Sequence, residues 1–269
     1  MARDTGTGKK TRRSSLCKRM AFTVPMGWGE LKQQEQLRKV LELLWMFSDR
    51  PDGILYAKMG ALLWFCDLEA VRHTPGGWLC RENKTKKTFV LADGLLPSMM
   101  EALEWLEHPE DMTIRLEEID GCKAADQWLR TLPFIRYIQA ENYYQAYLQT
   151  HEEKKLEMMA QQLYDIPEGK TFSAEPAELL GVLFWFMAIK KYYASVFTHF
   201  LKPVSDGQDA GTRQSQLEMT NAMIRLLSKG DVTKVKKIYN VDTWLALTEL
   251  DALAKESEEF KNKYGKRNV

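Results

Sequence analysis

The stretch Leu179-Leu180-Gly181-Val182-Leu183-Phe184-Trp185-Phe186-Met187-Ala188-Ile189 is the most apolar part of the chain, and it lies between Glu178 and Lys190. As a helix, these eleven residues would span about 16 Å, roughly half the hydrocarbon thickness of a bilayer. We therefore expect no transmembrane segment. A helix that is apolar on every side is typical of a protein core. The stretch predicts the central helix of a bundle, continuing with an aromatic face toward Pro203.

Amphipathic helices are predicted on both sides of this segment, because apolar residues recur there at steps of three and four. The stripes are Leu37, Val40, Leu41, Leu44 and Phe47; Leu55, Met59, Leu62, Leu63 and Cys66; Leu96, Met99, Leu103 and Leu106; Leu156, Met159, Ala160 and Leu163; Met219, Met223, Ile224 and Leu227; and Trp244, Leu247, Leu250 and Leu253. A further helix is expected from Ala124, with a boundary or kink at Pro133. Gly230 suits a helix C-cap, and Asp231 suits the cap of the next short helix.

Two short runs interrupt the helical pattern. Residues 78–81 and 88–91 flank a polar segment and follow the turn Pro75-Gly76-Gly77, so they predict a small β-hairpin. Residues 113–120 fit a short strand or an extended connector equally well.

The predicted fold is mainly α: an irregular helical bundle with a small β-hairpin insertion and a C-terminal helical appendage. Its expected parts are a basic, disordered arm over 1–21, the bundle over 22–202 with the hairpin near 78–91, a linker over 203–213, and C-terminal helices over 214–269.

The charge of the chain is unevenly distributed. The 269 residues hold 38 basic and 37 acidic side chains, a net +1. Residues 1–20 alone hold seven basic residues and one acid, a net +6, which leaves −5 for the rest. The arm favours three interpretations: a solvated tail, a targeting segment, or a contact with nucleic acid or an acidic partner. The nucleic-acid interpretation assigns the contact to Lys9, Lys10, Arg12, Arg13, Lys18 and Arg19.

No catalytic, cofactor or metal motif is recognisable. The four cysteines are far apart and form no zinc pattern, which favours a reducing, cytoplasmic setting. The segment Gly6-Thr7-Gly8-Lys9-Lys10 has Arg3 where a phosphate loop needs glycine. Glu104 and His108 would share one helix face, but the chain has no second Glu-x-x-His copy for a di-iron site. We expect a non-enzyme without cofactor or metal.

Three segments resemble helical proteins encoded in the tail-morphogenesis modules of phages and prophages of gut bacteria. They are Val24-Pro25-x-x-Trp28-x-Glu30-Leu31 with its glutamine-rich continuation; Phe134-Ile135-x-x-Ile138-x-Ala140-Glu141-Asn142-Tyr143-Tyr144, then Tyr147 and Leu163-Tyr164; and Gly230-Asp231-Val232-Thr233-Lys234 with Asp242-Thr243-Trp244-x-Ala246-Leu247-Thr248-Glu249-Leu250. This resemblance implies a chaperone-like or minor structural protein of phage tail assembly. It also implies another tail protein as partner, such as the tape measure, and a place in the bacterial host cytoplasm or the virion. The basic arm is outside the pattern.

The sequence therefore predicts a protein–protein interaction role, with Trp244, Leu247 and Leu250 contacting the partner. The same three side chains would alternatively dock the last helix on the bundle. The alternative function is a nucleic-acid-associated protein that uses the arm, and a third is an enzyme whose site is assembled from distant residues.

Overall fold

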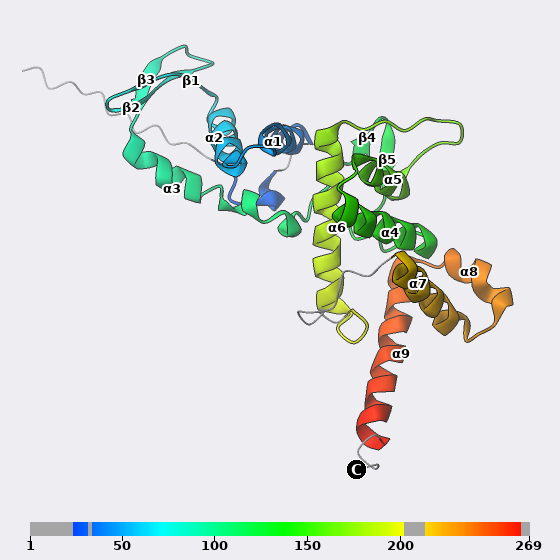
Figure 1. The fold of residues 1–269 in the computed structure, drawn as a ribbon. Coiled ribbons are helices and arrows are strands. Elements are labelled where there is room, and N and C mark those ends of the chain that lie inside the picture. The colour runs from blue at the N-terminus through cyan, green and yellow to red at the C-terminus, as the bar shows by residue number, and fades with distance from the viewer. Residues whose placement is uncertain (1–23, 32–33, 202–212, 265–269) are drawn as a thin grey trace, which may run out of the picture.

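The computed structural model describes residues 24–31, 34–201 and 213–264, and the chain is mainly α-helical over them (Figure 1). The basic arm and residues 203–212 of the expected linker lie outside this part of the chain. The helices are α1 (Gln34–Phe47), α2 (Gly53–Phe65), α3 (Leu96–Glu101), α4 (Phe134–Thr150), α5 (Glu153–Leu163), α6 (Pro176–Val196), α7 (Arg213–Ser228), α8 (Val235–Tyr239) and α9 (Thr243–Tyr264). The strands are β1 (Leu68–Thr74), β2 (Gly77–Glu82), β3 (Thr88–Leu91), β4 (Glu118–Ile119), β5 (Cys122–Ala124) and β6 (Tyr164–Asp165).

Helix α6 stands between α1 and α2 on one side and α4 and α5 on the other (Figure 1). It begins with Pro176 at its first turn, and a capping box joins Glu175 and Glu178, which satisfies backbone N–H groups that the helix leaves unpaired. Most of the apolar stretch is buried, including Val182, Trp185 and Phe186.

The eleven-residue apolar stretch is part of the longer helix α6. That helix has 21 residues and is long and apolar enough to cross a membrane by length and composition. Half of the 18 residues in its apolar part are buried inside the protein, however, as residues of a core helix would be. The helix also ends at Val196, before the expected Pro203.

The segment before α4 is irregular, so the helix expected from Ala124 is wrong up to Pro133. The Asp126 carboxylate accepts hydrogen bonds from the backbone N–H groups of Trp128, Arg130 and Thr131. Leu129 has a left-handed backbone with φ of 51°. These local bonds compete with the helical ladder, and α4 starts only after Pro133.

Two small sheets replace the single hairpin of the sequence analysis. Strands β2 and β3 pair antiparallel, with Trp78 opposite Leu91, but β1 pairs with β2 as well, so this sheet has three strands. Strands β4, β5 and β6 form a second three-stranded sheet. The helix expected over 96–106 also breaks: α3 ends at Glu101, and a 3-10 turn covers Glu104–Glu107.

Helices α7, α8 and α9 complete the described chain, and α9 extends away from the other helices (Figure 1). Its first turn is fixed to the segment before α4. The buried Thr243 donates both its backbone N–H and its hydroxyl to the carbonyl of Leu132, and Phe134 N–H donates to Val241 O.

Candidate functional site

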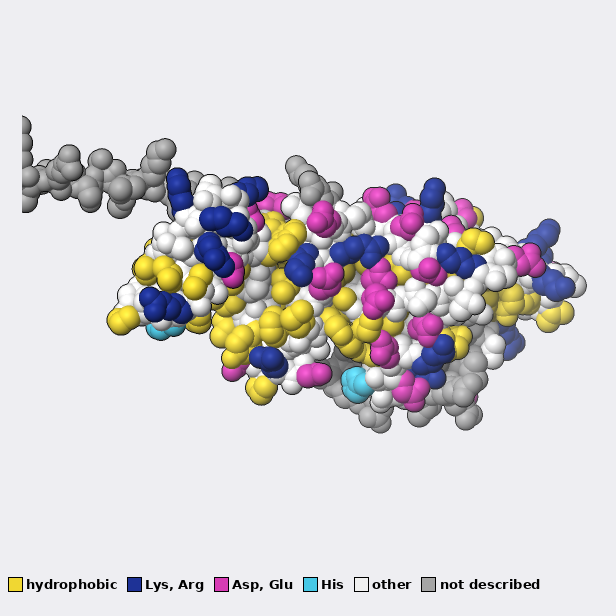
Figure 2. All heavy atoms as spheres, turned by 90° about the horizontal axis from the view of Figure 1, so that it is seen from above, with side chains coloured by type: hydrophobic (Ala, Val, Ile, Leu, Met, Phe, Trp, Pro, Cys, Tyr) yellow, Lys and Arg dark blue, Asp and Glu magenta, His cyan; other side chains and the backbone are white. Residues whose placement is uncertain are grey.

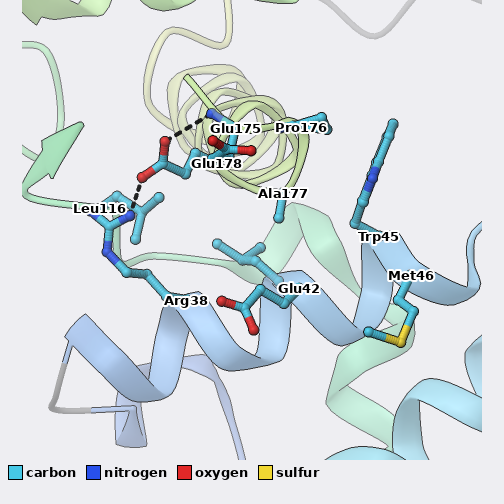
Figure 3. Close-up of a pocket in the computed structure, with 10 residues that line it drawn as sticks. Arg38, Glu42, Trp45, Met46, Leu116, Glu175, Pro176, Ala177 and Glu178 are labelled. Carbon is cyan, nitrogen blue, oxygen red and sulfur yellow. Dashed lines mark hydrogen bonds and ion pairs between the residues drawn. The ribbon is translucent and has the colours of Figure 1, made fainter. Parts of the chain in front are cut away.

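A hollow with a volume of about 690 Å³ lies between α1 and the start of α6 (Figure 3). We call it the α1–α6 groove. Its lining residues are Arg38, Leu41, Glu42, Trp45, Met46, Leu116, Glu175, Pro176, Ala177 and Glu178.

A close approach of the two helices forms the floor of the groove. A Cβ atom added at Gly181 of α6 would lie 2.6 Å from Cδ1 of Leu41, so only glycine lets α1 come this near without a shift. Leu41 is buried at this contact, whereas Trp45 and Met46 lie further along α1 and are 41% and 62% exposed. Figure 3 shows Trp45 and Met46 at the opposite end of the groove from Arg38 and Leu116.

A polar network fixes the Arg38 end of the groove. Arg38 forms an ion pair with Glu178, and its Nη2 donates to the carbonyl of Glu118 at 2.6 Å. The other Glu178 oxygen accepts the backbone N–H of Glu175 at 3.0 Å. The Arg38 side chain therefore joins α1 to the N-terminus of α6 and to strand β4, and this holds the wall of the groove in place.

A second hollow of about 490 Å³ lies around the turn between α1 and α2. It is lined by Leu44, Ser48, Arg50, Pro51, Gly53, Ile54, Leu106, Glu107, Leu180 and Phe184. Further exposed apolar side chains, Ile54, Leu55 and Tyr56, follow this turn on α2. Figure 2 shows hydrophobic side chains gathered over this part of the surface.

Helix α6 supplies a wall to both hollows from one stripe. Three residues of the run 179–189 are not fully buried, namely Leu180, Phe184 and Met187. With Ala177 they are spaced by three, four and three residues, so they share one helix face. Ala177 lines the groove, and Leu180 and Phe184 line the second hollow.

The charges at the groove favour a basic ligand. Three of its lining side chains are acidic, Glu42, Glu175 and Glu178, and one is basic, Arg38. Arg38 is matched by Glu178, and Lys39 lies 3.0 Å from Glu42. The Glu175 carboxylate, which caps α6, is the acid without an ion pair among the described residues, so the rim is net negative.

Of the expected contact residues, Leu247 and Leu250 are buried and Trp244 is partly buried. Leu247 and Leu250 are each 1% exposed. The Trp244 ring lies 5.1 Å from the ring of Phe197, and the Arg130 guanidinium lies 4.6 Å above it. The contacts of these three side chains within the protein dock the last helix on the rest of the chain.

The six basic residues expected to contact nucleic acid, Lys9, Lys10, Arg12, Arg13, Lys18 and Arg19, lie outside the described part of the chain. Glu104 and His108 do not share an α-helix face, because Glu104 begins a 3-10 turn over Glu104–Glu107 and His108 is the residue that ends it. His108 instead lies near Glu110 and Asp111, with ligand atoms within 4.8 Å of one another. Lys191 forms ion pairs with both acids, which already supplies them with a positive charge.

Burial raises the pKa values of several side chains, among them Cys66, Tyr164 and Tyr193. Burial raises the pKa of the Cys66 thiol to about 11, which leaves it almost entirely protonated at neutral pH. Burial also raises the pKa of Tyr164 and Tyr193, whose hydroxyls donate to the carbonyls of Leu116 and Trp128. The groove lining contains no histidine, cysteine or serine. Its chemistry suits apolar packing with a charged rim.

The stripe predicted for α1 does not include Trp45 and Met46, so the sequence alone did not identify the groove. Leu43-Leu44-Trp45-Met46-Phe47 is apolar at five consecutive positions, which exceeds the width of one buried face. That excess is the signal that could have identified an exposed apolar surface.

No protein-family model, curated protein or solved structure matches the chain.

Proposed function

We propose that this chain is a non-catalytic protein-interaction protein that holds an apolar helix of its partner in the α1–α6 groove. The observation that carries the proposal is the concentration of exposed apolar side chains beside a hollow of about 690 Å³. Monomeric surfaces seldom gather large apolar residues in one patch unless the patch is a binding site. Trp45 and Met46 are suited to anchor such a contact, because aromatic residues and methionine are enriched at interfaces.

The partner helix is expected to carry an apolar stripe flanked by lysine or arginine. The stripe would pack on Trp45, Met46 and Ala177, as in helix-in-groove recognition. Flanking cations would face Glu175 and Glu42 on the rim. The resemblance to phage tail-morphogenesis proteins supplies the partner class: another tail protein, such as the tape measure, bound during tail assembly.

The test is co-expression of the tagged chain with the tail proteins encoded by adjacent genes, followed by co-purification and measurement of affinity. Met46→Glu would place a charge in the apolar contact. Because 1.4 kcal/mol corresponds to tenfold in affinity, and an unpaired buried charge costs more than this, we expect a loss of at least about tenfold.

Met219→Glu on α7 is the matched control, because Met219 is 64% exposed, close to the 62% of Met46. The control should bind like the wild type. Equal binding by the Met46→Glu variant would overturn the proposed groove. A chain that binds none of the adjacent tail proteins would overturn the proposed function.

A further inference from the structure

The end of the molecule at α7 and α8 carries a dense group of cations, which we call the basic turn (residues 225–237). It holds Arg225, Lys229, Lys234, Lys236 and Lys237 against the single acid Asp231, a net +4. All five cations are exposed. Figure 2 shows dark-blue side chains at the end of the molecule where these helices lie.

Most of this charge is uncompensated. Lys234 lies 3.2 Å from Asp231. A hydrogen bond from the Thr233 hydroxyl lowers the pKa of Asp231, so this acid stays ionised at neutral pH and matches Lys234 alone. Among the described residues, no carboxylate lies within 4.0 Å of a cationic nitrogen of Arg225, Lys229, Lys236 or Lys237.

The backbone of the basic turn is well fixed. Lys229 and Gly230 have φ of 53° and 79°, and Gly230 N–H donates to the carbonyl of Arg225 at 3.0 Å, which closes α7. Asp231 accepts the backbone N–H of Thr233 at 3.0 Å and caps the next turn. Buried Ile238 anchors α8 to the rest of the protein. The cations are therefore carried by an ordered backbone over a short stretch of the chain.

The composition of the turn distinguishes between anionic partners. Protein interfaces are enriched in aromatic residues and depleted in lysine, whereas residues 225–237 contain four lysines and no aromatic residue. Helices that lie in a membrane surface need a broad apolar face, and α8 has five residues with Ile238 turned inward. Exposed Leu226 and Val232 supply two aliphatic side chains, which is too little for such a face. Phosphate contacts, by contrast, need mainly lysine and arginine.

We propose that the basic turn binds the phosphate backbone of nucleic acid without reading base sequence. Lysine ammonium groups act on phosphates as mobile point charges, while base recognition relies on bidentate groups such as arginine, asparagine and glutamine. Arg225 is the one such side chain in the turn. The inference is independent of the α1–α6 groove and places a nucleic-acid contact on the folded part of the chain rather than on the arm alone.

The test compares full-length wild type with the triple variant Lys229→Gln, Lys236→Gln, Lys237→Gln. Binding to fluorescent duplexes of about 20 base pairs and of two unrelated sequences is measured by anisotropy between about 50 and 200 mM salt. Each phosphate neutralised contributes about −0.9 to the slope of log affinity against log salt concentration. Three lost contacts therefore reduce the slope by about 2.7, so the wild type should lose about 40-fold more affinity than the variant over this fourfold salt range.

A second triple variant, Lys84→Gln, Lys86→Gln, Lys87→Gln, is the matched control. It removes the same charge from the exposed loop between β2 and β3. The control should keep the wild-type salt slope, and both duplexes should bind alike. Equal loss in the two variants, or an unchanged slope in the first, would overturn the proposal by assigning binding to overall charge or to the arm. Binding of anionic vesicles but not duplexes would overturn it as well.

Discussion

Leu245 and Leu247 provide a direct test of how α9 is attached. They lie two positions apart on the same helix, yet Leu247 is 1% exposed and Leu245 is 61% exposed. Leu247→Ala removes a buried branched side chain and leaves a cavity, so we expect a loss of about 2–5 kcal/mol in the free energy of unfolding. Leu245→Ala removes an exposed side chain, and we expect a change within about 0.5 kcal/mol.

The assay is urea unfolding followed by far-UV circular dichroism, with the free energy extrapolated to water. With an m-value of about 3 kcal/mol/M, a loss of about 3 kcal/mol lowers the midpoint by about 1 M. Equal midpoints for the two variants would refute the packing described for α9. If Leu247→Ala instead weakened partner binding with unchanged stability, the partner-contact role considered for this residue would be restored.

Three further predictions concern single groups. Thr243→Val keeps the shape but removes the buried hydroxyl that donates to Leu132, so the free energy of unfolding should fall by about 1 kcal/mol in the same assay. Asp126→Ala should cost about 1–2 kcal/mol at pH 7 by analogy with a helix cap. Burial opposes ionisation of Asp126, but the hydrogen bonds to its carboxylate outweigh burial and lower its pKa. The stabilisation by Asp126 is therefore present above the unfolded pKa of about 4 and disappears as pH falls through the lower folded pKa. Below pH 4 the wild type should lose more stability than the Asp126→Ala variant. Cys66, with its raised pKa of about 11, should be alkylated at pH 8 at least about 100-fold more slowly than a free cysteine thiol in peptide mapping.

The elements predicted correctly from the sequence are those that a local pattern of apolar or capping residues specifies. The stripe from Leu37 to Phe47 lies within α1 and ends with it, and Gly230 has a positive φ two residues after the end of α7, as expected of a helix C-cap glycine. Asp231 caps the following turn, also as expected. Each of these features depends on contacts within a few residues, so local pattern is sufficient to find it.

The missed elements depend on partners distant in the chain. Strand β1 is exposed at most positions and has no alternating pattern, because it is held by pairing with β2 rather than by burial. Strands β4 and β6 have two residues each, too few for any period, and β6 lies about forty residues from β5 in sequence. The irregular segment before α4 follows from the bonds to Asp126, which compete with a helix that its neighbours otherwise favour.

The apolar character of α6 has a consequence for the proposed site. A helix at the edge of a core normally carries polar residues on its outer face, but the outer stripe of α6 is Ala177, Leu180, Phe184 and Met187. The buried residues account for the inner faces, and the wall of the two hollows accounts for the outer one. The apolar length of α6 is thus explained by a helix with the core on its inner faces and the walls of the two hollows on the remaining stripe. It follows that Ala177→Gln should weaken partner binding in the proposed α1–α6 groove while lowering stability less than Val182→Ala, since Val182 is buried in the core and Ala177 lines the groove.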